Sequence, residues 1–129
     1  VSDYYFMKSL VFSSKTLEKD EFNLYRQIFY IIYSSLPKPD LYVYLHVPTE
    51  RLLKNIAMRG REYEKSITAD YLMGIKESYF NFFRQNPDNK YLILDIANID
   101  FVINSKDYAR ITEMIFHEPL KQGINLRNF

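Results

Sequence analysis

The chain has 129 residues, 47% of them hydrophobic and 17% aromatic, and a formal net charge of +1. This length fits one compact domain or a large part of one, and the balanced charge argues against nucleic acid or an anionic membrane as a partner. The chain lacks cysteine, which excludes disulfides and thiolate metal sites. Its apolar stretches are too short to span a membrane and no segment resembles a signal peptide, so we expect a cytoplasmic protein.

Two helices are predicted first, over residues 4–14 and, more strongly, over residues 20–35. The second has apolar residues at helical spacing, namely Phe22, Tyr25, Phe29 and Ile32. Other apolar side chains, Tyr30, Ile31 and Tyr33, lie off this stripe. A helix that is apolar around much of its circumference is buried or lies in an interface, so we expect a partner surface here.

The middle and end of the chain alternate between strands and helices. A strand is predicted over residues 41–47, a helix from Pro48 and Thr49 to about Met58, and a helix capped by Thr68. A second strand covers residues 91–94 and ends at Asp95, before a helix capped by Ser105 that runs to about 116. The continuous apolar strands predict an α/β protein with a parallel sheet covered on both faces. Because two strands do not form a stable sheet alone, we expect further strands from outside this sequence.

The most informative segment is 51–67, in which Arg59 and Arg61 flank Gly60 at the end of a predicted helix. Two guanidinium groups on a mobile loop are suited to neutralising charge on the oxygens of a phosphoryl group during its transfer. Spacing alone favours a simpler interpretation, in which Arg59 is a charge at the C-terminus of the helix and Gly60 is its C-cap.

The combination of motifs resembles the deoxynucleoside kinase family, and within it the bacterial deoxyadenosine/deoxyguanosine kinase branch. The resemblance rests on PKPDLYVYL at 37–45, Pro-Thr-Glu at 48–50, RGREYEKSI at 59–67 and Tyr-Leu at 71–72. It extends from about residue 2 to residue 116. It implies a P-loop kinase-type three-layer α/β fold with a parallel sheet, of which residues 1–129 are the C-terminal, mostly helical part. The lid of that kinase would lie at about 58–67.

The resemblance also implies roles for single residues. Arg59 and Arg61 would grip the donor and transferring phosphates, and Glu64 would hydrogen-bond the deoxyribose hydroxyl. Phe12 resembles the phenylalanine that stacks on the substrate base, although an apolar helix position is more often core.

The segment 95–101, DIANIDF, resembles the loop whose backbone receives the adenine of the phosphate donor, with Asp100 and Phe101 as its matching end. Asp95 and Phe101 also have purely structural interpretations. Asp95 is a natural turn former at the end of a strand, and Phe101 is a natural core residue.

The sequence departs from the family pattern at several positions. Asn55 stands where the family often has an arginine on the donor adenine, and Lys8 stands at the usual base-reading position. The catalytic-base motif has no clear copy; Asp3 is a candidate general base or base contact, and a helix N-cap is its simpler role. No GxxxxGK[ST] occurs, so we expect the phosphate-binding loop to precede Val1.

The leading hypothesis is phosphoryl transfer from ATP to the 5′-hydroxyl of a deoxynucleoside, with a purine favoured, in nucleotide salvage. Mg²⁺ would be bound largely through the phosphates, since the sequence predicts no protein metal site. One alternative is a nucleoside monophosphate kinase of the thymidylate or adenylate type. Another is a non-catalytic helical interaction module. In the leading hypothesis the 20–35 helix mediates a homodimer, and neither nucleic acid nor a membrane is a partner.

Overall fold

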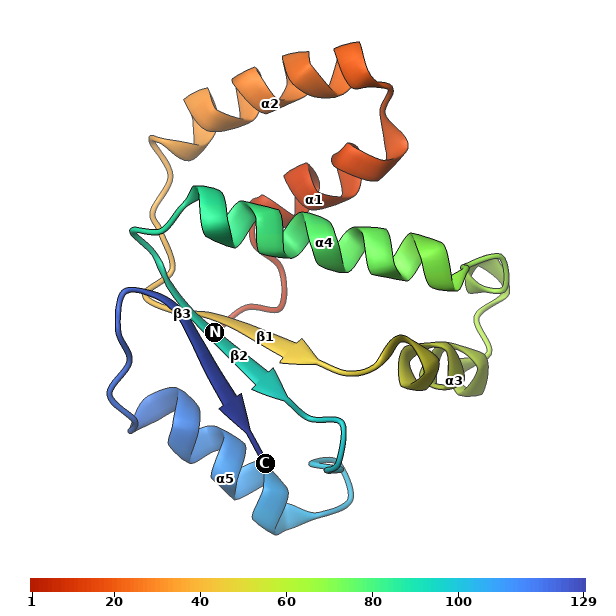
Figure 1. Cartoon of the computed structure of the whole chain (residues 1–129), viewed down its shortest axis with the longest axis vertical. Helices are drawn as coiled ribbons and strands as arrows, with labels where there is room; N and C mark the ends of the chain where they lie inside the picture. The colour runs from red at the N-terminus through yellow and green to blue at the C-terminus, as the bar shows by residue number, and fades with distance from the viewer. The chain divides into compact units, whose positions relative to one another are not determined.

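The computed structural model describes residues 1–129, which divide into two compact units (Figure 1). The first unit comprises Val1–Lys38 and Ile67–Phe82, and the second comprises Pro39–Ser66 and Phe83–Phe129. The elements in chain order are α1 (Met7–Thr16), α2 (Lys19–Tyr33), β1 (Tyr42–His46), α3 (Thr49–Arg59), the 3₁₀ turn η1 (Glu62–Glu64), α4 (Ala69–Gln85), β2 (Lys90–Asp95), α5 (Ser105–Phe116) and β3 (Gly123–Asn128). None of these helices is both long and apolar enough to cross a membrane.

The first unit is all-helical and is built around an aromatic cluster. Phe29 of α2 is 1% exposed, and its ring centroid lies 4.9 Å from that of Phe6 and 5.3 Å from that of Tyr33. Phe82 of α4 meets both Phe29 and Tyr33 edge-on. The aromatic residues of this cluster therefore form the core of the first unit, because stacked and edge-on rings pack with favourable geometry.

Helix starts in this unit follow local polar signals. Glu18 and Glu21 form a capping box at the start of α2, in which the Glu18 amide donates to Glu21 Oε1 at 3.2 Å. The predicted cap of α4 is confirmed, because Thr68 Oγ1 accepts a hydrogen bond from the Tyr71 amide at 3.2 Å. The first predicted helix begins at Met7 rather than at residue 4, after a turn in which the Ser2 hydroxyl donates to the Tyr4 carbonyl.

The inward face of α2 differs from the predicted stripe at one position. Phe29 is buried as predicted, but the prediction for Ile32 was wrong, because its side chain is 42% exposed and Tyr33 is buried instead. The exposed aliphatic residues recur at helical spacing beside the buried stripe and away from it. We call this set the α2 outer face: Leu24, Ile28, Ile31 and Ile32, which are 60%, 47%, 72% and 42% exposed.

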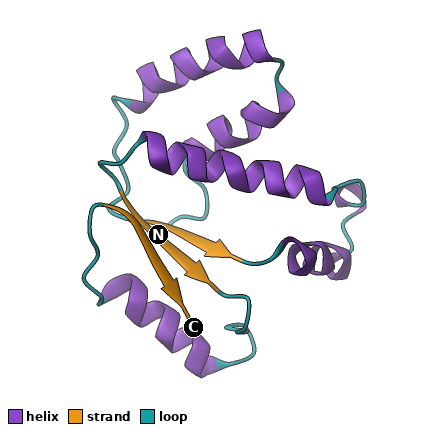
Figure 2. Cartoon of the chain, viewed as in Figure 1, coloured by secondary structure: helices purple, strands orange, loops and turns teal.

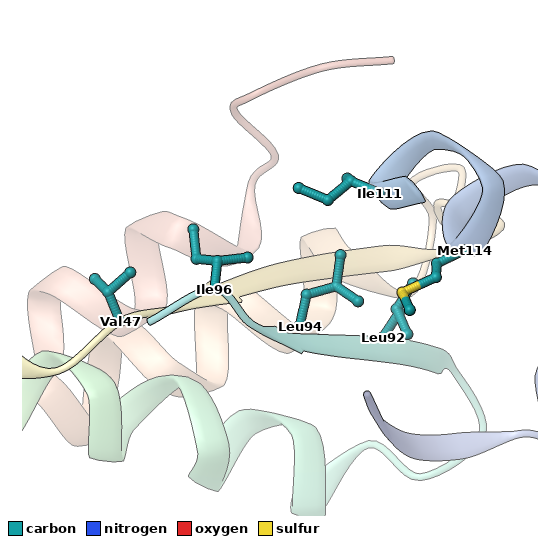
Figure 3. Close-up of a cluster of buried hydrophobic side chains, with 6 residues drawn as sticks. All are labelled: Val47, Leu92, Leu94, Ile96, Ile111 and Met114. Atoms are coloured by element: carbon teal, nitrogen blue, oxygen red, sulfur yellow. The ribbon is translucent and has the colours of Figure 1, made fainter. Parts of the chain in front are cut away.

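The second unit contains a three-stranded parallel sheet in the order β1-β2-β3 (Figure 2). The expectation of only two strands in this sequence was wrong, because residues 123–128 pair with β2 along its whole length. The central strand β2 is covered on both faces. Leu92 and Leu94 belong to a core cluster with Val47, Ile96, and Ile111 and Met114 of α5 (Figure 3). On the other face Tyr91 packs 4.4 Å from the Phe83 ring.

The α/β class with a parallel sheet is thus confirmed, and the strand buried on both faces matches its continuous apolar sequence. The start of α5 differs by one residue from the prediction. Asn104, not Ser105, is the N-cap, and its side chain accepts a hydrogen bond from the Lys106 amide at 3.0 Å.

Asn125 is the buried polar residue that fixes β3. Its side-chain amide donates to the carbonyls of Tyr91 and Lys121, at 3.1 and 2.7 Å, and its Oδ1 accepts from the Lys121 amide at 3.0 Å. We expect Asn125→Ala to lower the free energy of unfolding by about 2–3 kcal/mol, because buried backbone groups lose their partners. Urea denaturation measures this. Asn128→Ala, an exposed change in the same strand, is the control and should cost less than about 0.5 kcal/mol; equal losses would contradict the role.

Candidate functional site

The carboxyl ends of the three parallel strands meet at one edge of the sheet. His46 pairs with Asp95, and Asp95 pairs with Asn128, at the last positions of the strands. Helix α3 begins three residues after β1, and an irregular segment, 96–104, follows β2 at the same edge. In open α/β sheets this edge is where ligands bind. The predicted adenine loop therefore starts from this edge, as does α3, the helix that leads to the predicted lid.

The predicted lid begins at the end of α3, where the helix stops at Gly60. This residue has φ +68°, and its amide donates to the Ile56 carbonyl at 3.2 Å, which confirms the predicted C-cap. The chain then turns into η1, which returns Glu64 toward the end of α3. The cap therefore determines where the two arginines on either side of Gly60 are presented.

Gly60 allows a test of this turn that leaves the charges unchanged. No atom lies within 4 Å of the position that a Cβ would take, so the penalty of a side chain is conformational only. We expect Gly60→Ala to lower the free energy of unfolding by about 1 kcal/mol, and Gly60→Asn by less, because asparagine tolerates left-handed backbone. Chemical denaturation of both variants measures the difference. An alanine variant as stable as the parent would contradict the assignment.

The lid gathers three of the predicted site residues. Arg59 donates to Glu64 through Nε, at 3.0 Å to Oε1, and through Nη2 to Oε2. Arg61 is less engaged, with its Nε 4.0 Å from the same carboxylate and its Nη1 donating to the Tyr63 hydroxyl at 3.3 Å. The arginine side chains are 49% and 51% exposed, whereas that of Glu64 is 11% exposed. Two guanidinium groups share one carboxylate, which leaves a local positive charge open to an anion.

The loop after β2 contains the other predicted residues of this unit. Asp95 Oδ1 accepts from the Ala97 amide at 3.0 Å, so its turn-forming interpretation is confirmed. Asp100 Oδ1 accepts from the Val102 and Ile103 amides, at 3.0 and 3.2 Å. Phe101 packs, partly buried, against the core cluster, as its structural interpretation predicts. The side chains of Asp95, Asp100 and Phe101 therefore make contacts within the protein. The backbone of this loop is the part that we expect to contact a ligand.

Sequence reasoning gave no role to Arg51, which lies in the first turn of α3 and reaches the loop after β2. Its Nη1 donates to the carbonyls of Ile96 and Ala97, at 2.6 and 2.8 Å, and its Nη2 donates to that of Ile99, at 2.9 Å. A signal was present in the sequence. Arg51 is the third residue of α3, and a cation in the first turn opposes the helix dipole unless it has another partner.

Asp3 and Phe12, the remaining predicted residues, belong to the first unit. The N-cap interpretation of Asp3 was wrong, because Phe6 occupies the N-cap position of α1 and Asp3 lies before it; its carbonyl accepts from Lys8 Nζ at 2.5 Å. The core interpretation of Phe12 was also wrong, because its side chain is 41% exposed. An exposed phenylalanine on α1 is available to stack on a planar ligand.

The remaining polar features are the lack of a metal-binding cluster and one partly buried tyrosine hydroxyl. No group of three or more His, Asp or Glu side chains is arranged to hold a metal ion. Burial raises the pKa of the Tyr79 hydroxyl in α4 above its usual value.

A parallel α/β sheet, with paired arginines on a turn after the helix that leaves the carboxyl end of its first strand, is the arrangement expected of a P-loop kinase-type protein. The family model for deoxynucleoside kinase matches residues 1–120. The chain belongs to the deoxynucleoside kinase family.

Individual relatives agree with this assignment. The chain is 31% identical over 115 residues to a deoxyguanosine kinase of Bacillus subtilis, a match that covers 86% of this chain and 56% of that protein. It is 26% identical over 122 residues to a deoxyadenosine kinase of Lactobacillus acidophilus, covering 88% of this chain and 56% of that protein. A deoxyadenosine kinase of Dictyostelium discoideum is 30% identical over 69 residues, which are 54% of this chain and 28% of that protein. The chain thus spans about half the length of the first two relatives.

Proposed function

We propose that the protein containing this chain transfers the γ-phosphoryl group of ATP to the 5′-hydroxyl of a purine deoxynucleoside, in nucleotide salvage in the cytoplasm. The observation that carries the proposal is the lid, where two half-exposed guanidinium groups share a single carboxylate in a chain of this family. Guanidinium forks match the oxygens of a phosphoryl group, and phosphoryl transfer depends chiefly on positioning and charge neutralisation. The purine preference follows the names of the three relatives.

In this proposal residues 1–129 form the C-terminal part of one kinase domain, and a phosphate-binding loop is supplied by sequence outside them. The matches cover 56% of each of two relatives, which supports the view that the chain is part of a longer domain. Mg²⁺ would then be bound mainly through the phosphates of the nucleotide, with few protein ligands. Three acidic side chains of the second unit, those of Asp95, Asp100 and Glu64, are used in turns and an ion pair.

In this proposal the three lid residues contact different parts of the two substrates. Arg61, with the weaker contact to Glu64, binds the transferring phosphoryl group, and Arg59 binds the donor phosphates. The Glu64 carboxylate accepts a hydrogen bond from the deoxyribose hydroxyl. This is compatible with its pairing to Arg59, because a carboxylate offers about four acceptor sites and a bidentate guanidinium uses only two. The backbone of the loop 95–101 receives the adenine of ATP.

The first unit supplies the substrate side of the proposal. Phe12, exposed on α1, stacks on the purine, and Asp3 is the candidate general base or base contact. The α2 outer face mediates a homodimer, because four exposed aliphatic side chains at helical spacing are an apolar surface that association would bury.

The test is a substrate panel with the complete protein, Mg²⁺ and ATP. We expect deoxyadenosine and deoxyguanosine to yield their 5′-monophosphates, and the corresponding monophosphates to be unreactive as acceptors. Conversion of monophosphates to diphosphates would instead support a kinase of the thymidylate or adenylate type. Absence of phosphorylation of every deoxynucleoside would reject the proposal.

A further inference from the structure

The geometry of Arg51 differs from that of the two lid arginines. Arg59 and Arg61 are directed to a carboxylate, whereas the contacts of Arg51 are three backbone carbonyls, all within 2.6–2.9 Å. The hydrogen bonds span 45 to 48 residues of sequence, from the first turn of α3 to the loop after β2. They are charge-assisted and therefore stronger than neutral hydrogen bonds.

The loop between Ile96 and Ile99 has few other backbone anchors. The Ile96 amide donates to the His46 carbonyl at 2.9 Å, and the Ile99 amide donates to the Ile96 carbonyl at a long 3.4 Å. The side chain of Ile96 is in the core cluster, which fixes the start of the loop, and Ile99 is only partly buried. The guanidinium of Arg51 thus holds both ends of this stretch through carbonyl oxygens.

Three of the five donors of this guanidinium are directed at carbonyls. A group committed in this way is not a third phosphate-gripping arginine. Its effect on a nucleotide would pass through the shape of the loop.

We propose that Arg51 is a positioning residue that fixes the loop 96–99 against α3 in the conformation that receives the base of the phosphate donor. The inference rests on the proposed function. Its consequence is selective: loss of Arg51 loosens donor binding, because the loop must be ordered when the nucleotide binds. Binding of the deoxynucleoside and the chemical step at saturating donor are unaffected.

The test compares Arg51→Ala, Arg51→Lys and the parent in the complete protein by steady-state kinetics and by direct calorimetric titration with Mg²⁺-ATP. We expect the KM and Kd for ATP to rise about tenfold or more in Arg51→Ala, with kcat and the KM for deoxynucleoside within about twofold. Arg51→Lys should fall between, because an ammonium keeps the charge but lacks the planar fork. Lys54→Ala, which removes an exposed charge one turn along α3, is the matched control.

The possible results distinguish failure of the Arg51 role from failure of the proposed kinase function. A parent protein that neither binds ATP nor phosphorylates deoxynucleosides rejects both. An active parent whose Arg51 variants keep the parental KM for ATP, or raise both KM values together with a lower Tm, rejects the positioning role alone. If Arg51→Ala does not fold, Arg51→Lys is compared with the parent instead. An unchanged KM for ATP in Arg51→Lys would then reject the positioning role.

Discussion

If the proposed function holds, replacing Arg61 by alanine is expected to lower the kcat of the complete protein by about 10²–10³-fold, with little change in stability. The reason is that preorganised donors directed at charge developing in a transition state are worth this much when removed singly. Arg61 is the cleaner of the two lid arginines to test. Its contact to Glu64 is long and its side chain is 51% exposed, so its loss leaves no buried group without a partner.

Arg59→Ala should also abolish most activity, but its effect has two parts. The change removes a phosphate contact and leaves Glu64, which is 11% exposed, without its bidentate partner. A fall in stability is therefore expected in addition to the fall in kcat.

The matched control for both variants is Lys65→Ala. This residue is in the same lid, its side chain is 67% exposed, and its partner Glu62 is 86% exposed. An exposed pair of this kind contributes little, so kcat should stay within about twofold of the parent. Single-turnover measurements at saturating ATP separate chemistry from binding. If Arg61→Ala retained parental kcat, or if Lys65→Ala lost as much, the lid arginines would not be the phosphoryl-binding groups.

Parts of the fold with a local signal were predictable from the sequence. The cap at Thr68, the left-handed stop at Gly60 and the buried strand ending at Asp95 each depend on residues within a few positions of one another. Strand β3 was not predicted, because it contains glycine and two asparagines and alternates only weakly. Its strand conformation comes from pairing with β2, more than thirty residues earlier, and from the buried amide of Asn125.

The inward face of α2 shows a different limit. Ile32 and Tyr33 are both apolar and lie about 100° apart around the helix, so periodicity alone did not decide which one faces the core. Packing decides it, because the ring of Tyr33 stacks on Phe29 and meets Phe82.

The part of the candidate site that lies within one short sequence motif was predicted. Arg59, Arg61 and Glu64 lie within six positions, and the structure does bring them together. The role of Arg51 was not predicted because its partners are backbone carbonyls, which every residue type carries. These carbonyls also lie 45 to 48 residues away in the sequence. For Phe12, exposure could only be decided by the packing of α1.

Introducing a charge on the α2 outer face is expected to convert a homodimer of the complete protein into monomers. Leu24 and Ile31 are 60% and 72% exposed and lie two turns apart on one side of α2. Burying an aliphatic side chain of this size is worth about 1.5–3 kcal/mol, and a buried unpaired carboxylate costs more than this. A Leu24→Glu/Ile31→Glu variant should therefore weaken the dimer by at least about a hundredfold.

Sedimentation equilibrium at micromolar protein measures the change, and Asn23→Glu is the matched control. Asn23 is exposed and lies about 100° around the helix from Leu24, so the control adds one negative charge to α2 off the apolar face, where the double variant adds two on it. We expect this control to stay dimeric and both variants to keep the parental far-UV spectrum, because the inward residue Phe29 is untouched. A parent protein that is monomeric at micromolar concentration, or a double variant that remains a dimer, would show that the α2 outer face is not the interface. The aliphatic face of α2 would then need a different partner to explain why its exposed side chains are apolar.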